Sequence, residues 1–87
     1  MAALDQQIIE LIADQLRVDL GRVTPDKTIV GDLWADSVAV VELTAAIEEA
    51  FGIDVPDRDV PTLQTVGDVL FYVRARVAEK GGGQGHS

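Results

Sequence analysis

The sequence contains no cysteine, one histidine and only two serines. Without cysteine the chain can form no disulfide and offers no thiolate nucleophile, and a zinc site of the usual Cys/His type is excluded. The histidine, His86, lies in the C-terminal segment, so a Ser-His-Asp hydrolase triad within the fold is excluded as well. We therefore expect no metal site and no self-sufficient hydrolase. If a serine of this chain is chemically active, we expect it to be Ser37, because the other serine, Ser87, is the last residue.

Basic residues and long apolar runs are also scarce. Seven lysines and arginines stand against fifteen acidic residues, a formal net charge of −8. This charge disfavours nucleic-acid binding, which needs cations to displace counterions from phosphates, and favours encounters with basic protein surfaces. No apolar run approaches the ~20 residues of a membrane span, and the N-terminus lacks the pattern of a signal peptide. We expect a single cytoplasmic domain that does not contact a membrane.

Three stretches carry apolar residues at the three- and four-residue spacing of amphipathic helices. The first covers residues 3–17, the second residues 37–51, and the third follows Thr65, which is expected to cap it together with Asp68. Residues 18–35 form a long connection that is expected to be ordered, because several of its apolar residues can pack on the helices. In the second connection, residues 57–60 can form one helical turn, which Pro61 limits.

These patterns predict an all-α fold, with three main helices and a short helix in third position, forming a four-helix bundle with a long first loop. Strand alternation and hairpin-type turns are absent. Residues 1–80 are expected to form the single domain, with the last helix fraying near Lys80. Residues 81–87 are expected to form a flexible glycine-rich tail.

The stretch around Ser37 joins a polar turn to the second helix. Asp36 is a suitable N-cap, because its carboxylate can accept from the free backbone N–H groups that open a helix. Ser37 then occupies the first helical position, beside the positive end of the helix dipole, where a phosphate group would be stabilised.

The second helix has two different sides. One side is assigned to the core and contains Val40, Leu43, Thr44, Ile47 and Phe51. The other side mixes short apolar residues with carboxylates: Val38, Val41, Glu42, Ala45, Glu48 and Glu49. From the pattern alone this outer side is either a protein-docking surface or an ordinary solvated surface. Gly52 is expected to end the helix.

Three ordered motifs resemble those of the acyl carrier proteins of fatty-acid and polyketide synthesis. Residues 32–38 read Asp-Leu-Trp-Ala-Asp-Ser-Val, similar to the Asp-Leu-Gly-Ala-Asp-Ser-Leu of that family. Residues 46–57, Ala-Ile-Glu-Glu-Ala-Phe-Gly-Ile-Asp-Val-Pro-Asp, and residues 64–68, Gln-Thr-Val-Gly-Asp, resemble its next two motifs. The resemblance runs from about Leu4 to about Val77 and covers nearly the whole chain.

The resemblance implies a cofactor and partners. In the family, the serine of the Asp-Ser pair is esterified by 4′-phosphopantetheine, which a separate phosphopantetheinyl transferase takes from coenzyme A. Carried over, Ser37 is the attachment point and Asp36 lies beside it, so the thiol that holds acyl groups belongs to the cofactor. Matching acidic positions for docking to lysine and arginine patches on acyl-loading and acyl-processing enzymes are Glu42, Glu48 and Glu49. The apolar centre is Val38, Val41 and Ala45. The chain is expected to be a monomer.

The family also shelters acyl chains among its helices. The residues that would line such a space here are Val40, Leu43, Ile47, Phe51, Leu63, Val66 and Leu70. An ordinary filled core explains the same residues equally well. The sequence departs from the family pattern at four positions. Trp34 replaces the usual glycine three residues before the serine, Val38 is shorter than the customary leucine or methionine, Ala39 replaces a common acidic residue, and Pro61 is expected to shorten the third helix. These changes favour a specialised biosynthetic pathway over housekeeping fatty-acid synthesis.

The sequence thus predicts a free-standing acyl carrier protein, not an enzyme, that holds acyl intermediates as thioesters on the arm of Ser37 for polyketide, other specialised or fatty-acid synthesis. A peptidyl or aminoacyl carrier of the nonribosomal type is the nearest alternative, but its usual Gly-Gly-x-Ser differs from residues 34–37. A small acidic helical adaptor without a prosthetic group is an alternative of another class.

Overall fold

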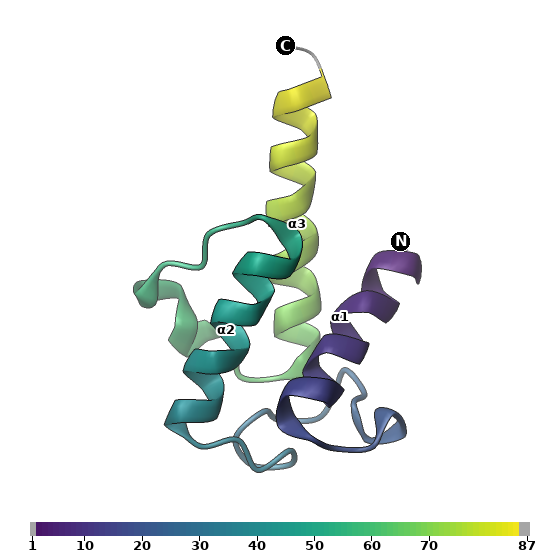
Figure 1. Ribbon diagram of the computed structural model, residues 1–87, viewed down its shortest axis with the longest axis vertical. Coiled ribbons are helices and arrows are strands. Elements are labelled where there is room, and N and C mark those ends of the chain that lie inside the picture. The colour runs from purple at the N-terminus through teal and green to yellow at the C-terminus, as the bar shows by residue number, and fades with distance from the viewer. Residues whose placement is uncertain (1, 86–87) are drawn as a thin grey trace.

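The computed structural model describes residues 2–85 of the 87-residue chain and is built from helices (Figure 1). Three helices are long: α1 (Ala2–Leu16), α2 (Ser37–Phe51) and α3 (Val66–Gly85). Two short 3-10 helices lie between them, η1 (Leu20–Arg22) and η2 (Asp57–Thr62). Within residues 2–85 there is no strand, only an isolated bridge between Thr28 and Thr65. The predicted all-α fold is confirmed, and η1 is an additional turn that the sequence did not predict.

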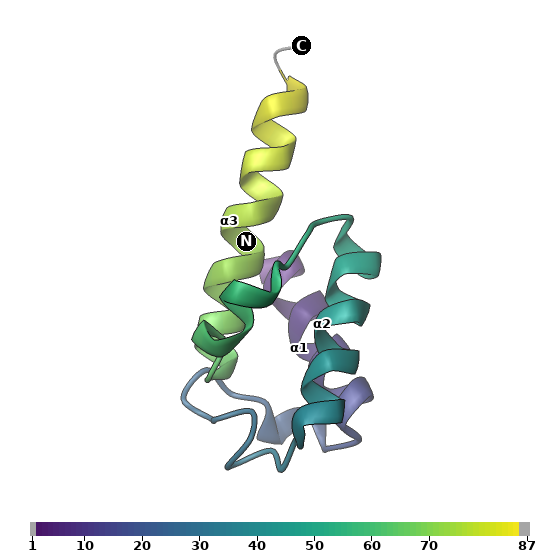
Figure 2. The ribbon, with the colours of Figure 1, turned by 90° about the vertical axis from the view of Figure 1, so that its left-hand side faces the viewer.

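α1 packs against both other long helices. η2 and α1 lie on opposite sides of the molecule, with α2 and α3 between them, and α3 extends beyond the other helices (Figures 1 and 2). The centre of the core consists of side chains with at most 2% exposure: Ile8, Ile12, Ile29, Leu33, Leu43, Ile47, Val66, Val69 and Val73. Ile29 and Leu33 come from the first loop, which confirms that apolar residues of this loop pack against the helices.

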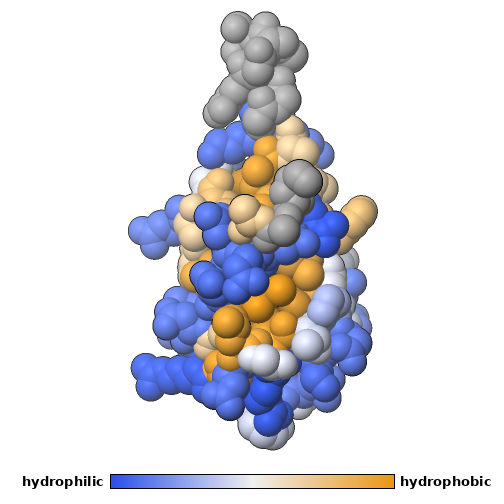
Figure 3. Space-filling model, turned by 90° about the vertical axis from the view of Figure 1, so that its right-hand side faces the viewer, coloured by the Kyte–Doolittle hydropathy of each residue, from blue (hydrophilic) through white to orange (hydrophobic). Residues whose placement is uncertain are grey.

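α1 does not bury its whole apolar side. Leu4, Ile9, Leu11 and Leu16 pack against the core but remain partly exposed. Figure 3 shows apolar side chains gathered on the side of the molecule where α1 lies, bordered by hydrophilic ones. A small domain has a high ratio of surface to volume, so some apolar surface of this kind is expected.

The helix ends follow local capping chemistry. Gly52 ends α2 with φ of 65°, and its N–H donates to the carbonyl of Glu48. At the start of α3, Thr65 Oγ1 accepts from the N–H of Asp68 at 3.0 Å, while the Asp68 carboxylate accepts from the N–H of Thr65 at 3.0 Å. This reciprocal pair is a capping box. Both predicted ends are confirmed.

The end of α3 differs from the prediction. The sequence predicts fraying near Lys80, but the backbone is helical to Gly85. Each glycine costs about 1 kcal/mol relative to alanine in a helix interior. Extending an existing helix, however, adds one hydrogen bond for each residue that becomes ordered. His86 and Ser87 lie outside the described residues, and the division of the chain into a domain and a tail at residue 80 stays a prediction.

Candidate functional site

Ser37 is the first residue of α2 and its side chain is exposed. The residue before it, Asp36, has extended backbone, and its carboxylate accepts from the N–H of Ala39 at 2.8 Å. The carbonyl of Asp36 accepts the first helical hydrogen bond, from Val40, at 2.9 Å. Asp36 is therefore the N-cap, as predicted. The serine hydroxyl lies where the helix dipole is positive and first-turn N–H groups lack partners within the helix.

The loop in front of Ser37 is held by reciprocal hydrogen bonds between Thr28 and Asp32. The Asp32 carboxylate accepts from the N–H of Thr28 at 2.9 Å, and Thr28 Oγ1 accepts from the N–H of Asp32 at 2.8 Å. Leu33 and Ala35 point inward and are 2% and 4% exposed. The polar turn and the two buried side chains together determine where the chain enters α2.

The same loop is bonded to the start of α3. Ile29 N–H donates to the carbonyl of Gln64 at 2.8 Å, and Val66 N–H donates to the carbonyl of Lys27 at 2.9 Å. Gly67 N–H donates to the carbonyl of Pro25 at 2.9 Å, and a Cβ at Gly67 would lie only 3.1 Å from that oxygen. The glycine of the Thr-Val-Gly-Asp motif thus allows a close approach between the two segments.

Trp34 lies between the two buried residues of the loop and points outward. Its side chain is 72% exposed and its φ is 59°, in the left-handed region. For a residue with a side chain, that conformation costs roughly 1–2 kcal/mol. The guanidinium carbon of Arg22, from η1, lies 4.8 Å from the ring centroid, within the range of a cation–π contact. A glycine, which the resembling motif has at this position, would adopt this backbone without strain.

A pocket of about 750 Å³ opens beside Ser37, and we call it the Ser37 pocket. Its walls come from the first loop, the N-terminal half of α2, and η2 with the segment that follows it. The lining residues are Thr28, Val30, Gly31, Ala35, Asp36, Ser37, Val40, Val41, Val60, Pro61, Leu63 and Gln64. Most of these present apolar surface, so the pocket suits an uncharged, apolar group attached near the serine.

Only two of the seven predicted cavity residues, Val40 and Leu63, line the Ser37 pocket. Leu43, Ile47, Val66 and Leu70 are buried in the core instead. Phe51 is half-buried at the far end of α2, beside a separate, more polar hollow next to α1. The sequence analysis missed the loop and η2 residues, because residues outside a periodic segment give no signal for the direction of their side chains.

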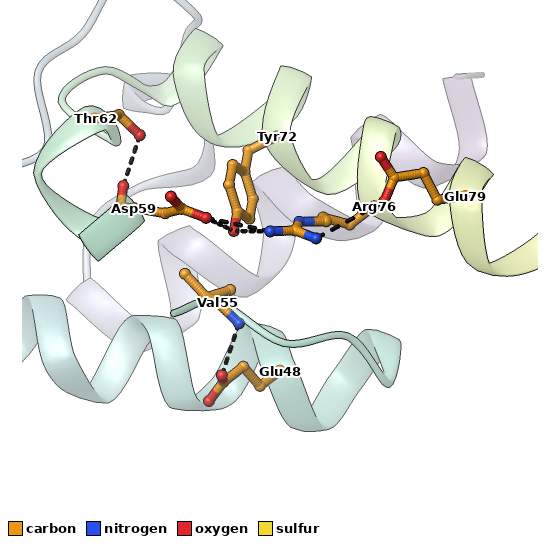
Figure 4. Close-up of polar contacts among 7 residues, drawn as sticks. All are labelled: Glu48, Val55, Asp59, Thr62, Tyr72, Arg76 and Glu79. Carbon is orange, nitrogen blue, oxygen red and sulfur yellow. Dashed lines mark hydrogen bonds and ion pairs between the residues drawn. The ribbon is translucent and has the colours of Figure 1, made fainter. Parts of the chain in front are cut away.

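The outer side of α2 is mostly exposed to solvent. Val38 and Val41 are 62% and 63% exposed, and Glu42, Ala45 and Glu49 are exposed as well. Glu48 differs, because its carboxylate accepts from the backbone N–H of Val55 at 2.8 Å and its residue is half-buried (Figure 4). Five of the six predicted docking residues therefore present their side chains to solvent, and the sixth holds the connection that leads to η2.

A polar cluster joins η2 to α3, and we call it the Asp59 cluster (Asp59, Tyr72 and Arg76; Figure 4). The Tyr72 hydroxyl donates to the Asp59 carboxylate at 2.6 Å, and Arg76 donates to the same carboxylate oxygen at 3.2 Å. The hydrogen bond from Tyr72, with a smaller contribution from Arg76, lowers the pKa of Asp59. Burial, and then the bond to Asp59, raises the pKa of Tyr72. The charged carboxylate is thus the form that fastens η2.

Two further classes of function find no support in the described residues. Between Ala2 and Gly85 no group of three or more His, Cys, Asp or Glu residues is placed to hold a metal ion. No helix in this range has both the length and the apolar character to cross a membrane.

Comparison with known proteins identifies relatives that match most of the chain. Residues 6–73 match a family model described as "Phosphopantetheine attachment site". The chain is 45% identical over 73 residues to the acyl carrier protein of Syntrophobacter fumaroxidans (strain DSM 10017 / MPOB), a match that covers 84% of this chain and 90% of the relative. It is 48% identical over 71 residues to the acyl carrier protein of Helicobacter pylori (strain G27), a match that covers 82% of this chain and 91% of the relative.

A solved structure shows the same arrangement of helices. The acyl carrier protein from Enterococcus faecalis superposes with a TM-score of 0.73 at 28% sequence identity. The match covers 86% of this chain and 95% of the solved one. Sequence and fold therefore point to the same family.

Proposed function

The chain belongs to the acyl carrier protein family, and on that premise we propose that Ser37 bears a 4′-phosphopantetheine arm on which acyl groups are carried as thioesters to enzymes in trans. Acyl carrier proteins are carriers rather than catalysts, and membership implies this covalently bound prosthetic group. The observation that supports Ser37 is its position: an exposed hydroxyl on the first residue of α2, directly after a capping aspartate and beside the Ser37 pocket.

The attachment reaction fits these surroundings. Ser37 Oγ forms an ester bond to the phosphate of the pantetheine arm, the diphosphate bond of coenzyme A breaks, and the serine proton and adenosine 3′,5′-bisphosphate leave. The new phosphodiester carries a negative charge at the N-terminus of α2, where the helix dipole stabilises an anion. Asp36 keeps its carboxylate on the Ala39 N–H, so it positions the helix end while a separate transferase supplies the chemistry.

The Ser37 pocket supports an apolar acyl cargo of the fatty-acid or polyketide kind. Burying an alkyl chain stabilises by about 0.8 kcal/mol for each CH₂ group. An aminoacyl group would bring an ammonium into the same surroundings, and an unpaired charge in apolar surroundings is costly. The pocket thus favours an acyl carrier over the aminoacyl alternative.

The outer side of α2 is proposed as the surface that meets enzymes. Val38, Val41 and Ala45 would form its apolar centre, and Glu42 and Glu49 would face lysine and arginine patches on the transferase and on acyl-loading and acyl-processing enzymes. An exposed ion pair contributes only ~0–1 kcal/mol. Several weak pairs steer the encounter and still permit rapid release, which a shuttle between enzymes requires. Glu48 would contribute less, because its carboxylate already binds Val55.

Intact mass spectrometry tests the attachment. The chain is incubated with coenzyme A, Mg²⁺ and a broad-specificity phosphopantetheinyl transferase, beside a Ser37→Ala variant with unchanged circular dichroism. We expect a mass gain of one phosphopantetheine in the wild type and none in the variant. A folded wild type that never gains the arm would support the adaptor alternative. Loading with acyl and with aminoacyl donors then separates the two carrier types.

A further inference from the structure

We infer that Trp34 and Arg22 form a recognition element for the phosphopantetheinyl transferase that modifies Ser37. The matching enzyme surface would be an apolar recess with a carboxylate at its edge. The recess would accept the indole ring, and the carboxylate would pair with the guanidinium. This inference rests on the proposed function of Ser37 and adds to it the kind of enzyme surface that the chain selects.

Distance places the pair within reach of the transferase. This enzyme must bring its active site to the serine hydroxyl itself, whereas enzymes that act later reach the thioester at the far end of the arm. A standard interface covers about 800 Å² on each partner, a disc of roughly 16 Å radius. Three residues of extended chain span at most about 11 Å, so the backbone of Trp34 lies within such a disc centred on Ser37.

The backbone presents the ring outward. Leu33 and Ala35 are buried on either side, so the loop is anchored at both neighbours while Trp34 is 72% exposed. Its left-handed backbone, with φ of 59°, is one that glycine would adopt more easily. The ring is also too exposed to contribute much to the core. Strain kept at an exposed position next to a functional residue points to a role in function.

Arg22 adds a positive charge to a molecule that has seven basic and fifteen acidic residues. Its guanidinium stacks on the Trp34 ring, and in the described part of the chain no carboxylate forms an ion pair with it. Stacking on a ring leaves the edge of a guanidinium free to bind a carboxylate through two hydrogen bonds. The outer side of α2, by contrast, is acidic. A uniformly basic enzyme surface would suit α2 but would repel Arg22, so the pair selects for a surface of mixed charge.

Steady-state kinetics of pantetheinylation test this inference. A panel of purified transferases, including those encoded in the same genome as this chain, is assayed with the wild type, Trp34→Gly, Trp34→Phe and Arg22→Gln. For the transferase that modifies the wild type best, we expect Trp34→Gly to raise KM at least tenfold and Arg22→Gln about three- to tenfold, with kcat nearly unchanged. Trp34→Phe should fall between the wild type and Trp34→Gly.

Controls separate recognition from folding and from general exposure. Circular dichroism and urea unfolding confirm that each variant is folded. Phe71→Ala removes an equally exposed aromatic side chain, 73% exposed, from α3 and should leave KM unchanged. Replacing the facing carboxylate of the transferase with lysine should restore the KM for Arg22→Glu.

Three results would overturn the inference. KM values within twofold of the wild type for both Trp34→Gly and Arg22→Gln would show that the transferase does not recognise Trp34 and Arg22. A lower KM for Trp34→Gly with every transferase would show that the indole ring only hinders binding of the transferase. If neither the wild type nor Trp34→Gly acquires the arm from any transferase, the proposed function itself fails, and this inference fails with it.

Discussion

Arg17 and Trp34 both have left-handed backbone, with φ of 58° and 59°, and each precedes a residue whose N–H donates to an earlier carbonyl. Arg17 follows the last residue of α1, and the N–H of Val18 donates to the carbonyl of Ala13 at 3.1 Å. That bond is the six-residue closure of a Schellman motif, which requires a left-handed residue at the position of Arg17. Trp34 ends no helix, but the next residue, Ala35, donates its N–H to the carbonyl of Ile29 at 3.1 Å, so the left-handed residue lies where the first loop closes on itself.

We predict that Arg17→Gly stabilises the fold by about 1 kcal/mol, because glycine adopts the required backbone without the penalty that a Cβ imposes. Gly52→Ala, at the equivalent end of α2 with φ of 65°, should destabilise by a similar amount. Urea unfolding at neutral pH measures both changes. Arg17→Ala is the control, because it removes the charge but keeps the strain. A gain for Arg17→Ala equal to that for Arg17→Gly would assign the effect to charge instead.

At the scale of the elements, η2 stands apart from the long helices. It contributes no buried residue, yet its Val60 and Pro61 line the Ser37 pocket. Among the described side chains, the hydrogen bonds between η2 and α3 both end on the Asp59 carboxylate. The Asp59 carboxylate, together with the packing of Val60 against the core, therefore holds η2 beside the pocket, and elements with few buried contacts open at low cost in free energy.

The Asp59 cluster leads to a prediction about pH. Because the pKa of Asp59 is lowered in the folded state, its stabilising effect is complete above the ordinary value of 3.8 and is lost as the pH falls through the lowered pKa. Asp59→Asn and Tyr72→Phe should lower the free energy of unfolding at neutral pH. On acidification, the free energy of unfolding of both variants should fall less than that of the wild type. Urea titrations at neutral pH and at several values below 3.8 measure this.

A matched control exists for this prediction. The pKa of Asp26 is also lowered, chiefly by a hydrogen bond from Thr24, but that bond lies within the first loop and does not involve η2. Hydrogen exchange should therefore accelerate at residues 57–64 in Asp59→Asn and remain unchanged there in Asp26→Asn. Equal exchange in both variants would show that the Asp59 cluster does not fasten η2.

At the scale of the whole molecule, acidic residues outnumber basic ones, and few of the described carboxylates are paired with a cation. The formal net charge is −8, and the ion pairs among residues 2–85 all involve Arg74 or Arg76 of α3. The carboxylates on the outer side of α2 have no cation among these pairs. Repulsion among them opposes the compact state, because folding brings like charges closer together.

We predict that salt stabilises this fold. Raising the ionic strength from ~0.01 M to ~0.15 M shortens the Debye length from about 30 Å to about 8 Å, which screens repulsion between separate carboxylates more than it weakens a close ion pair. The free energy of unfolding should therefore rise with NaCl. Thermal unfolding at a series of NaCl concentrations measures it. A fall in stability over this range would mean that the α3 ion pairs outweigh the repulsion.

The parts of the fold that depend on neighbours in sequence could be predicted. Asp36, Gly52 and the Thr65–Asp68 capping box act within four residues, so their roles follow from residue type and position. The core stripes of the helices follow from periodicity. Glu48 shows where this reasoning stops, because the wheel of α2 placed it outside while its partner, Val55, lies beyond the end of the helix.

The Ser37 pocket could not be predicted in the same way. Its walls come from residues 28–37, from Val40 and Val41, and from residues 60–64, three segments that tertiary structure brings together. Periodicity identifies the most deeply buried side of a helix, so it selected Leu43 and Ile47, which are buried in the core and do not line the pocket. The proposal that Ser37 bears the arm needed only the local motif and the resemblance.

Trp34 is the only tryptophan of the chain. Its indole therefore produces essentially all the long-wavelength ultraviolet fluorescence of the protein, and it emits from a water-exposed position three residues from the serine. The stacked guanidinium of Arg22 adds a charge whose displacement would alter that emission. The molecule thus contains an intrinsic optical reporter in the loop before Ser37, which allows the approach of an enzyme to be followed in real time without a dye.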